Sequence, residues 1–417
     1  MTSVEITQES NSFDFVAMQQ ITNPQLPKRF DAANLQVAFS TKTDKELKLA
    51  HWLLSILKHP MLVKAGGLVT VWALKVHLPI KALIRKTIYR LFCGGETAQE
   101  ALQVVQKLAS ARVQTVLDYA AEAQETEEGF DKVRNEILRN ISLANQTKSF
   151  SYISVKLTGI GHKHIFQKLT EGEPLSHTEN AAFIRTEVRL DAICKAAAEA
   201  GVTVYIDAEE TWLQDPMDSL AEGMMRRYNT KRAVVFNTLQ MYRNDRIEYL
   251  HDCLKRFTNE QVILGIKLVR GAYLEKEQQR AAKYDYLSPV FAQKEDTDRS
   301  FNHAIDICLE NLDRLELCCA THNEFSTTYL TRRIQKGEIK DHYKRIHFSQ
   351  LYGMSDNLTY NLADAGFNAS KYLPYGDVAT AVPYLIRRAE ENTSIAGQTG
   401  RELYLLEQEM QRRSLVS

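Results

Sequence analysis

The strongest constraint on the fold of this chain is a regular alternation of short β-type runs with helical segments, from about residue 115 to residue 394. Eight runs are rich in β-branched and aromatic residues: Thr115–Glu122, Tyr152–Thr158, Thr203–Glu209, Ala233–Gln240, Val262–Ala272, Leu315–Asn323, Ile346–Gly353 and Ser370–Tyr375. Helical patterns lie between them, for example Glu179–Ala200, Pro216–Arg227, Arg243–Phe257, Ser300–Leu312, Ser326–Lys336 and Asp356–Ala365. This alternation predicts an α/β fold, a (β/α)8 barrel of the TIM type.

A doubly wound parallel sheet is the competing topology for such an alternation. That fold usually has a glycine-rich turn after its first strand, and the nearest candidate, Gly159-Ile-Gly161, lacks the third glycine of the motif. The chain also has no phosphate-binding loop and no internal repeat. We therefore expect the barrel.

Two flanking regions accompany the barrel. We expect residues 1–95 to form a helical accessory region, residues 96–394 the barrel, and residues 395–417 a helical tail. A capping box at Thr97–Glu100 predicts the helix that leads into the barrel. Within the accessory region we expect helix breaks at His59-Pro60, Gly66-Gly67 and Leu78-Pro79.

The accessory region has a one-sided charge pattern. Residues 47–95 contain eight Lys or Arg residues and no Asp or Glu, interleaved with large apolar residues such as Trp52 and Trp72. A basic amphipathic surface of this kind suits an anionic membrane face. The alternative is a helical cap on the barrel with its lysines in water, and both interpretations stay open.

Composition narrows the range of partners. The formal net charge of zero favours no nucleic-acid partner. Six cysteines show no C-x-x-C pair and no zinc-type spacing, so we expect reduced thiols and no metal. The first ten residues carry acids and no arginine, unlike a signal peptide or presequence, and no apolar run reaches the ~18 residues of a spanning helix. We expect a cytoplasmic protein whose membrane contact, if any, is peripheral and at the inner face.

Polar side chains occur where the predicted strands end, which is the functional face of such a barrel. They are Asp118, Glu122, Lys156, Asp207, Glu209, Gln240, Arg270, Tyr273, Thr321, His322, Gln350 and Tyr372. Because a buried ammonium requires an acid or an anionic ligand, Lys156 is expected to pair with Asp207 on the next strand. The pair either seals the barrel as an internal ion pair or belongs to a functional pocket.

The second basic feature follows the last strand. Arg387 and Arg388 lie on the helix after Tyr372, and paired arginines bind a carboxylate or phosphate through two-pronged donor geometry. Glu391 is spaced to hold one guanidinium while the other takes a ligand. With Lys156 across the rim, the three cations would form a carboxylate pocket.

These motifs resemble those of the proline dehydrogenase family over about residues 96–394. The matching segments are Val155-Lys-Leu157, Tyr205-Ile-Asp-Ala-Glu-Glu210, Gly265-Ile-Lys-Leu-Val-Arg-Gly-Ala-Tyr273, Ala320-Thr-His-Asn323, Tyr372-Leu-Pro-Tyr-Gly376 and Tyr384-Leu-Ile-Arg-Arg388. The resemblance implies FAD held on the barrel rim without a Rossmann fold. It also implies oxidation of L-proline to Δ1-pyrroline-5-carboxylate by hydride transfer from C5 to flavin N5, as the first step of proline catabolism, with electrons passed to a membrane quinone.

The resemblance assigns roles residue by residue. Asp207 would be the active-site acid that orients Lys156, and Lys267 would place a positive charge near the flavin where bacterial relatives often have Arg. The expected cofactor contacts are Ala208, Gln240, Arg270, Gly271, Ala272, Thr321 and His322. The expected substrate contacts are Lys156, Arg387 and Arg388 to the carboxylate and Leu268, Tyr273, Tyr372 and Tyr384 to the ring. Glu122 or Glu391 would close the pocket by pairing with Arg388.

Three alternatives remain. Hydroxyproline dehydrogenase is the nearest, although members that prefer hydroxyproline tend to have a smaller residue where Tyr372 stands. In a different class, Lys156 would be the Schiff-base lysine of a barrel lyase. A barrel that senses an amino acid without catalysis is the third.

Overall fold

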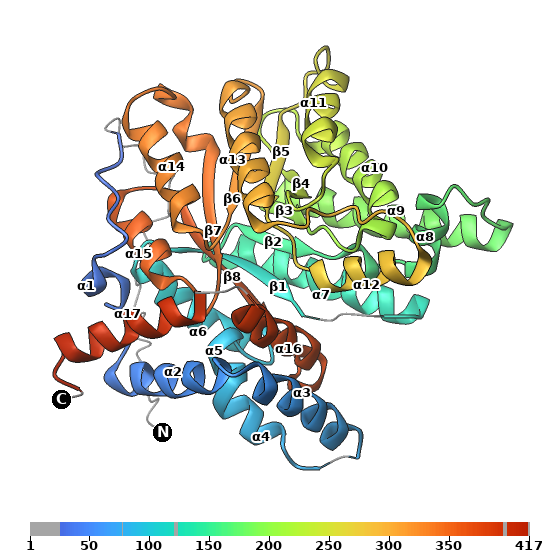
Figure 1. The fold of residues 1–417 in the computed structure, drawn as a ribbon. Helices are drawn as coiled ribbons and strands as arrows, with labels where there is room; N and C mark the ends of the chain where they lie inside the picture. Colours follow the sequence, from blue (N-terminus) through green and yellow to red (C-terminus); the bar gives the residue numbers. More distant parts are fainter. Residues whose placement is uncertain (1–25, 77, 121–123, 395–397, 416–417) are drawn as a thin grey trace, which may run out of the picture.

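In the computed structural model, eight parallel strands form a closed barrel, which confirms the predicted fold class (Figure 1). The structure describes residues 26–76, 78–120, 124–394 and 398–415. Each strand pairs with the next, and β8 pairs with β1 to close the ring. The strands are β1 Gln114–Tyr119, β2 Tyr152–Val155, β3 Thr203–Ile206, β4 Val235–Gln240, β5 Leu264–Val269, β6 Leu315–Ala320, β7 Ile346–Leu351 and β8 Ala369–Tyr375.

Helices follow the strands and cover the outside of the barrel (Figure 1). From β1 to β8 they are α7 Glu127–Thr147, η2 Leu157–Gly159, α8 Lys163–Thr170, α9 His177–Ala200, α10 Thr211–Tyr228, α11 Arg246–Arg256, α12 Leu274–Tyr284, α13 Lys294–Glu310, α14 Glu324–Gln335, η3 Lys340–Arg345 and α15 Asp356–Ala365. The prediction was least accurate for α13, which begins six residues before the expected start at Ser300. α10 begins five residues before the expected start at Pro216 and carries this proline inside the helix.

Most strands end earlier than their β-type runs. β2 stops at Val155 rather than Thr158, and β3 stops at Ile206 rather than Glu209. At these ends the side chain of Glu209 accepts hydrogen bonds from the backbone N–H and the hydroxyl of Thr158. The polar residues therefore leave the sheet ladder and form the loops of the carboxyl-terminal rim.

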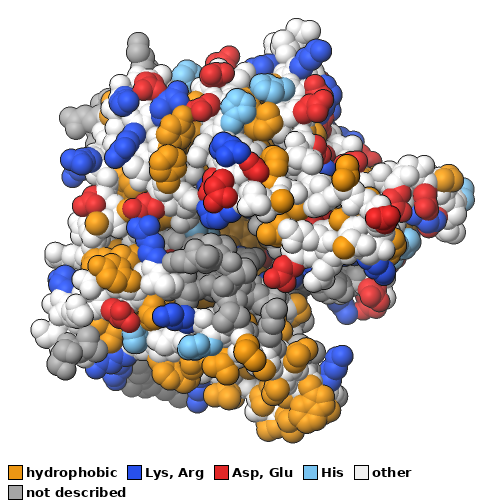
Figure 2. Space-filling model, viewed as in Figure 1, with side chains coloured by type: hydrophobic (Ala, Val, Ile, Leu, Met, Phe, Trp, Pro, Cys, Tyr) orange, Lys and Arg blue, Asp and Glu red, His pale blue; other side chains and the backbone are white. Residues whose placement is uncertain are grey.

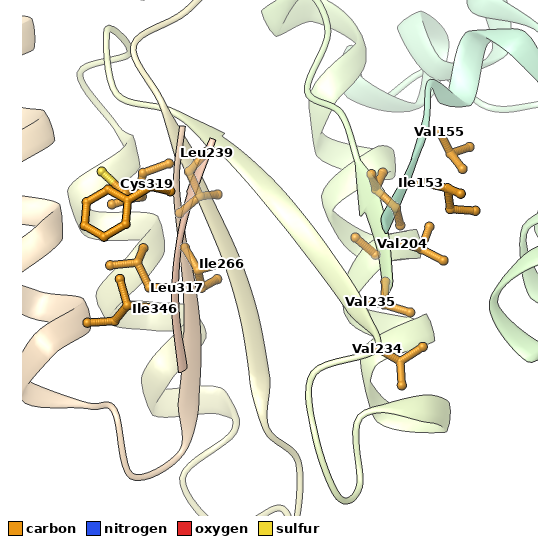
Figure 3. Packing of buried hydrophobic residues seen from close by; sticks show 14 of the residues in the cluster. Ile153, Val155, Val204, Val234, Val235, Leu239, Ile266, Leu317, Cys319 and Ile346 are labelled. Atoms are coloured by element: carbon orange, nitrogen blue, oxygen red, sulfur yellow. The ribbon is translucent and has the colours of Figure 1, made fainter. Parts of the chain in front are cut away.

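Strand alternation divides the buried residues into two layers. On the outer face, apolar side chains such as Ile153, Val204, Leu239 and Ile266 form the core between the sheet and the helices (Figure 3). Tyr205, Phe236, Cys318 and Tyr372 form a separate cluster with Val116 and Ala233. The outer layer stabilises the barrel and leaves the opposite strand face available for polar residues.

The region before the barrel is helical, as expected. It contains α1 Leu35–Ala38, α2 Asp44–Leu57, α3 Pro60–Lys75, α4 Lys81–Ile84, η1 Arg85–Tyr89 and α5 Arg90–Phe92. The expected break at Gly66-Gly67 is wrong, because α3 runs through both glycines. A Cβ at Gly67 would lie 3.5 Å from the side chain of Ile386, an ordinary van der Waals distance, so the close approach does not require glycine. The packing of α3 against α16 offsets the poor helix propensity of the two glycines.

The helix after β8 does not cover the side of the barrel. Instead α6 Ala98–Ser110, whose N-cap residue is Thr97 as predicted, packs against β1 and β8. α16 Val378–Ser394 and α17 Gln398–Arg412 pack with the N-terminal helices. Their shared hydrophobic cluster also includes Ala120 and Met354, which follow the carboxyl ends of β1 and β7. The division at residues 95 and 394 stays a prediction, since this packing joins both flanking regions.

Candidate active site

The carboxyl ends of β1, β2, β3, β5 and β8 bring five polar residues into contact. Asp118, Asp207, Lys267 and Tyr372 are buried, and the side chain of Lys156 is 18% exposed. Alternation along β1, β5 and β8 turns Asp118, Lys267 and Tyr372 toward the barrel interior. Lys156 and Asp207 directly follow the ends of β2 and β3. Charges from distant parts of the chain therefore meet at one point.

Asp207 is the centre of this cluster. Its Oδ1 accepts from Lys267 Nζ at 2.7 Å, and its Oδ2 accepts from Ser154 Oγ and from the Tyr372 hydroxyl, each at 2.7 Å. Lys156 Nζ lies 3.6 Å from the same Oδ2. Both carboxylate oxygens are thus oriented by charge-assisted hydrogen bonds, which are the stronger kind.

The surroundings keep Asp207 ionised. Burial alone would raise the pKa of its carboxyl, but Lys267, Lys156 and the Tyr372 hydroxyl together hold the pKa well below its ordinary value. Burial raises the pKa of the Tyr372 hydroxyl well above its usual range, helped by Asp118 and Asp207, so it stays a donor. The site is therefore preorganised around one carboxylate.

Lys156 forms the expected ion pair with Asp207, but two of its other contacts are shorter. Its Nζ lies 3.4 Å from Asp118 Oδ2 and 3.2 Å from the Tyr372 hydroxyl, both shorter than its distance to Asp207. The closest cation to Asp207 is Lys267, which lies two strands away and also contacts the rings of Tyr205 and Tyr372. Two carboxylates within 3.6 Å stabilise Lys156 as an ammonium, whereas a Schiff-base lysine must become neutral.

A second cluster lies at the ends of β5 and β6. Arg270 donates to Asp298 at 2.7 Å, to Thr321 Oγ1 at 2.5 Å and to Ser326 Oγ at 3.0 Å. Its guanidinium also lies 4.4 Å from the centre of the Phe301 ring. Asp298 balances the charge of Arg270, and the two hydroxyls fix the orientation of its guanidinium at the rim.

Gln240 joins the loops after β3 and β5. Its Nε2 donates to the backbone carbonyl of Glu209 at 2.7 Å, and its Oε1 accepts from the backbone N–H of Ala272 at 3.1 Å. Burial raises the pKa of the Glu209 carboxyl to about 7, against the lowering effect of Thr158. A buried amide and a buried carboxyl thus set the positions of the residues around Ala208.

Small residues leave part of this rim open. Gly271 and Ala272 are exposed after β5, and Ala208 is partly exposed after β3. Tyr273 follows them, and the Lys276 ammonium lies over its ring. By contrast Leu268 is fully buried in the outer core, because alternation turns it away from Lys267. We therefore leave Leu268 out of the proposed substrate pocket.

The expected arginines lie on α16. Arg388 is buried, with its guanidinium 5.3 Å from the ring of Tyr384, which is also buried. Arg387 is partly exposed. The convergence of these arginines with Lys156 on one carboxylate stays a prediction, and the expected gate residues Glu122 and, by its side chain, Glu391 lie outside the described residues.

His322 follows the carboxyl end of β6. Burial, reinforced by Lys371, Arg388 and Arg270, lowers the pKa of its imidazole to about 3, so it is neutral. Its Nδ1 lies 2.9 Å from Ser355 Oγ. Sequence reasoning did not find Ser355, because nothing in its local pattern marks it as a partner of a residue on another strand.

No group of three or more His, Cys, Asp or Glu residues suited to a metal occurs within the described ranges. The fold and the charged rim together define a (β/α)8 barrel enzyme with a buried, preorganised carboxylate.

Comparisons with known proteins give the family. A family model described as proline dehydrogenase matches residues 101–401. The carbapenem antibiotics biosynthesis protein CarD of Pectobacterium carotovorum subsp. carotovorum is 36% identical over 325 residues, covering 78% of this chain and 84% of the relative. Mitochondrial proline dehydrogenase 1 of Arabidopsis thaliana is 31% identical over 380 residues, covering 81% and 76%. The chain therefore belongs to the proline dehydrogenase family, whose members are oxidoreductases acting on proline.

A solved structure agrees with the fold. Proline utilization A (PutA) from Bdellovibrio bacteriovorus, inactivated by N-propargylglycine, superposes with a TM-score of 0.66 at 20% identity. The match covers 88% of this chain and 36% of that longer chain. At this identity the likeness concerns the barrel fold.

Proposed function

We propose that this protein catalyses the FAD-dependent oxidation of L-proline to Δ1-pyrroline-5-carboxylate, the first step of proline catabolism. The observation that carries the proposal is the buried carboxylate of Asp207, held between Lys267, Lys156 and Tyr372 at the rim of the barrel. This arrangement supplies fixed charges to orient a zwitterionic substrate. Family membership supplies the reaction type.

The rim fits a flavin by its donor set and by its open surface. Exposed Gly271 and Ala272, with partly exposed Ala208, leave room for a flat ring, and Arg270 adds a guanidinium that Asp298 and Thr321 hold in place. Gln240 and His322 would complete the contacts. When bound, FAD supplies the two-electron acceptor that takes hydride from C5 of proline.

The chain's own residues bind and orient the substrate. Lys156, Arg387 and Arg388 would hold the proline carboxylate through charge-assisted contacts, while Tyr273, Tyr372 and Tyr384 would wall the ring. Asp207 positions Lys156 and Tyr372 and holds Lys267 as a cation near the flavin. The amine proton leaves to solvent before the hydride does, and positioning supplies most of the remaining rate enhancement.

A gate would close this pocket. Glu122 or Glu391 would pair with Arg388 over bound substrate and release it on opening. Replacement Glu122→Ala tests the role of Glu122: the gate requires a change in KM or kcat for proline, and unchanged values for both would remove Glu122 from the mechanism.

The test of the main proposal is an anaerobic visible spectrum of the purified protein before and after addition of L-proline. Bleaching of a yellow chromophore by proline is the expected result. A colourless protein that FAD does not reconstitute, or a yellow protein that proline leaves oxidised, would contradict the proposal. Covalent trapping by borohydride with a carbonyl substrate would instead indicate the Lys156 lyase.

Hydroxyproline oxidation is the second candidate. A hydroxyproline dehydrogenase of Xenopus laevis is 35% identical over 257 residues, which cover 61% of this chain and 54% of that relative. In this chain the Tyr372 hydroxyl is held by Asp207 and Ser154, which leaves a bulky ring where the 4-hydroxyl of hydroxyproline would need space. We expect kcat/KM to be higher for proline, and a Tyr372→Ser variant to reduce that preference.

The electron acceptor is proposed to be a membrane quinone, reached through a peripheral contact of residues 47–95. Large apolar side chains on α3 and directly after it are each at least 48% exposed: Met61, Leu62, Leu68, Val69, Trp72 and Val76. Figure 2 shows hydrophobic side chains gathered over α3 and α4 at the lower edge of the molecule. No helix among the described residues is both long and apolar enough to span a bilayer.

Basic residues flank this apolar segment along the chain. Lys58, Lys75, Lys81, Arg85 and Lys86 are exposed. An apolar helix face rimmed by lysines binds anionic lipid through both burial and charge. Sedimentation of the protein with anionic vesicles, compared with neutral vesicles, tests this contact. A protein that sediments with neither kind of vesicle would contradict it.

A further inference from the structure

The C-terminal helix α17 is fastened to the barrel rim close to His322. Glu402 in its first turns accepts from the backbone N–H of Ser355 at 2.6 Å and from Ser355 Oγ at 3.2 Å. Arg401 beside it pairs with Glu324 at the start of α14. Only a cavity of about 20 Å³ remains between these groups and His322, room for about one water.

The hydrogen bonds define the tautomer of His322. The backbone N–H of Leu351, which can only donate, points to Nε2 at 3.4 Å. Nε2 is therefore the acceptor, and Nδ1 carries the proton and donates it to Ser355 Oγ at 2.9 Å. Ser355 then donates its own hydroxyl proton to Glu402. The chain of donors runs from the imidazole to the C-terminal helix.

The backbone of Ser355 is independent evidence that this arrangement has a role. Ser355 precedes α15 with φ 51° and ψ 44°, a left-handed conformation that is unfavourable for a residue with a side chain. Serine at this position usually caps the helix with its hydroxyl, but here it makes no side-chain cap bond. The strain and the lost cap are offset by the two hydrogen bonds to Glu402, and strain of this kind concentrates at functional sites.

We propose that α17 is a positioning element of the cofactor site: Glu402, acting through Ser355, holds His322 in one orientation and in the Nδ1–H tautomer. Both ring nitrogens then face the protein, and His322 offers a neutral ring surface to the rim. The functional consequence rests on the proposed function, because it requires that the rim bind FAD. The tautomer itself does not.

The test uses full-length protein labelled with ¹⁵N-histidine, with His322→Gln assigning the resonances. Wild-type protein is expected to show an Nδ1–H tautomer for His322, and Glu402→Ala is expected to give a mixture of tautomers and about tenfold weaker FAD affinity, the effect of about one hydrogen bond. Glu402→Gln keeps an oxygen acceptor and should restore both measurements. Ser355→Ala should reproduce the Glu402→Ala result without touching α17.

A matched control lies on the same helix. Glu407 pairs with His51 at the surface, so Glu407→Ala should leave the His322 tautomer and the FAD affinity unchanged. An Nε2–H tautomer in the wild-type protein would overturn the proposal, as would an unchanged tautomer in Glu402→Ala and Ser355→Ala. If the protein bound no FAD, the proposed function would fail while the tautomer measurement still decided the arrangement of His322.

Discussion

The rim of the barrel holds its charges in buried pairs, whereas residues 47–95 carry charges of one sign, many of them exposed. Asp207 shares its two oxygens among cations and hydroxyls within 3.6 Å. Residues 47–95 have no acid at all. Removing a buried charge from water is costly unless a partner is held in place, while an exposed cation costs little and remains available to a partner. The rim is thus suited to orienting a small molecule and the helices to meeting a surface.

The largest expected effect comes from breaking the central pair. Asp207→Ala leaves Lys267 buried without its closest partner, so we expect about 3–5 kcal/mol lower unfolding free energy and, since Lys156 and Tyr372 lose their orientation, at least ~100-fold lower kcat/KM for proline. Urea unfolding and steady-state kinetics measure both. Asp207→Asn, which keeps the shape, should lose less stability, and wild-type kinetics in either variant would refute the role of Asp207.

Substitutions on the exposed surface of α3 should change membrane binding without changing stability or catalysis. Leu68→Glu combined with Trp72→Glu should weaken binding to anionic vesicles by about 10- to 100-fold, since each side chain contributes apolar area at the interface. Both side chains are at least 60% exposed, so stability and proline oxidation with a soluble acceptor should remain unchanged. Ile184→Glu, at another exposed apolar residue far along the chain on α9, is the control and should bind vesicles as wild type does.

The buried carboxyl of Glu209 at the rim should make the stability of the protein depend on pH, unlike the exposed cations of residues 47–95. The folded-state pKa of Glu209 is about 7, above its ordinary value of 4.5, so the stability that Glu209 contributes is present below pH 4.5 and is lost as pH rises through 7. The Glu209→Gln side chain cannot ionise. The unfolding free energy of this variant, relative to that of the wild type, should therefore rise by about 1–3 kcal/mol between pH 5 and pH 8. Urea unfolding at the two pH values measures the difference, and a difference that did not change with pH would show that Glu209 is not titrating.

The smallest effect concerns single surface cations. Lys75→Ala and Lys86→Ala should each weaken binding to anionic vesicles by about 1 kcal/mol, roughly fivefold, and leave binding to neutral vesicles unchanged. Raising the salt concentration should remove the difference between variant and wild type. Persistence of the difference at high salt would assign it to packing rather than to charge.

Much of the barrel followed from local patterns. The β-type runs located all eight strands, and Lys156 and Asp207 were placed at neighbouring strand ends because strand order fixes which ends lie side by side. The expected helix break at Gly66-Gly67 was wrong, because the packing of α3 against α16, more than 300 positions away, outweighs local propensity.

By itself, then, the sequence determined the alternation that closes the barrel, the residues at its rim and the single sign of charge between residues 47 and 95. Only the tertiary structure decided that Lys267 rather than Lys156 makes the shortest contact to Asp207, that Leu268 faces the outer core, and that Glu402 reaches His322 through Ser355. The reason is physical. Periodicity is a local property of the chain, whereas partners of buried polar groups are chosen by distances across the closed barrel, which depend on how every strand and helix packs.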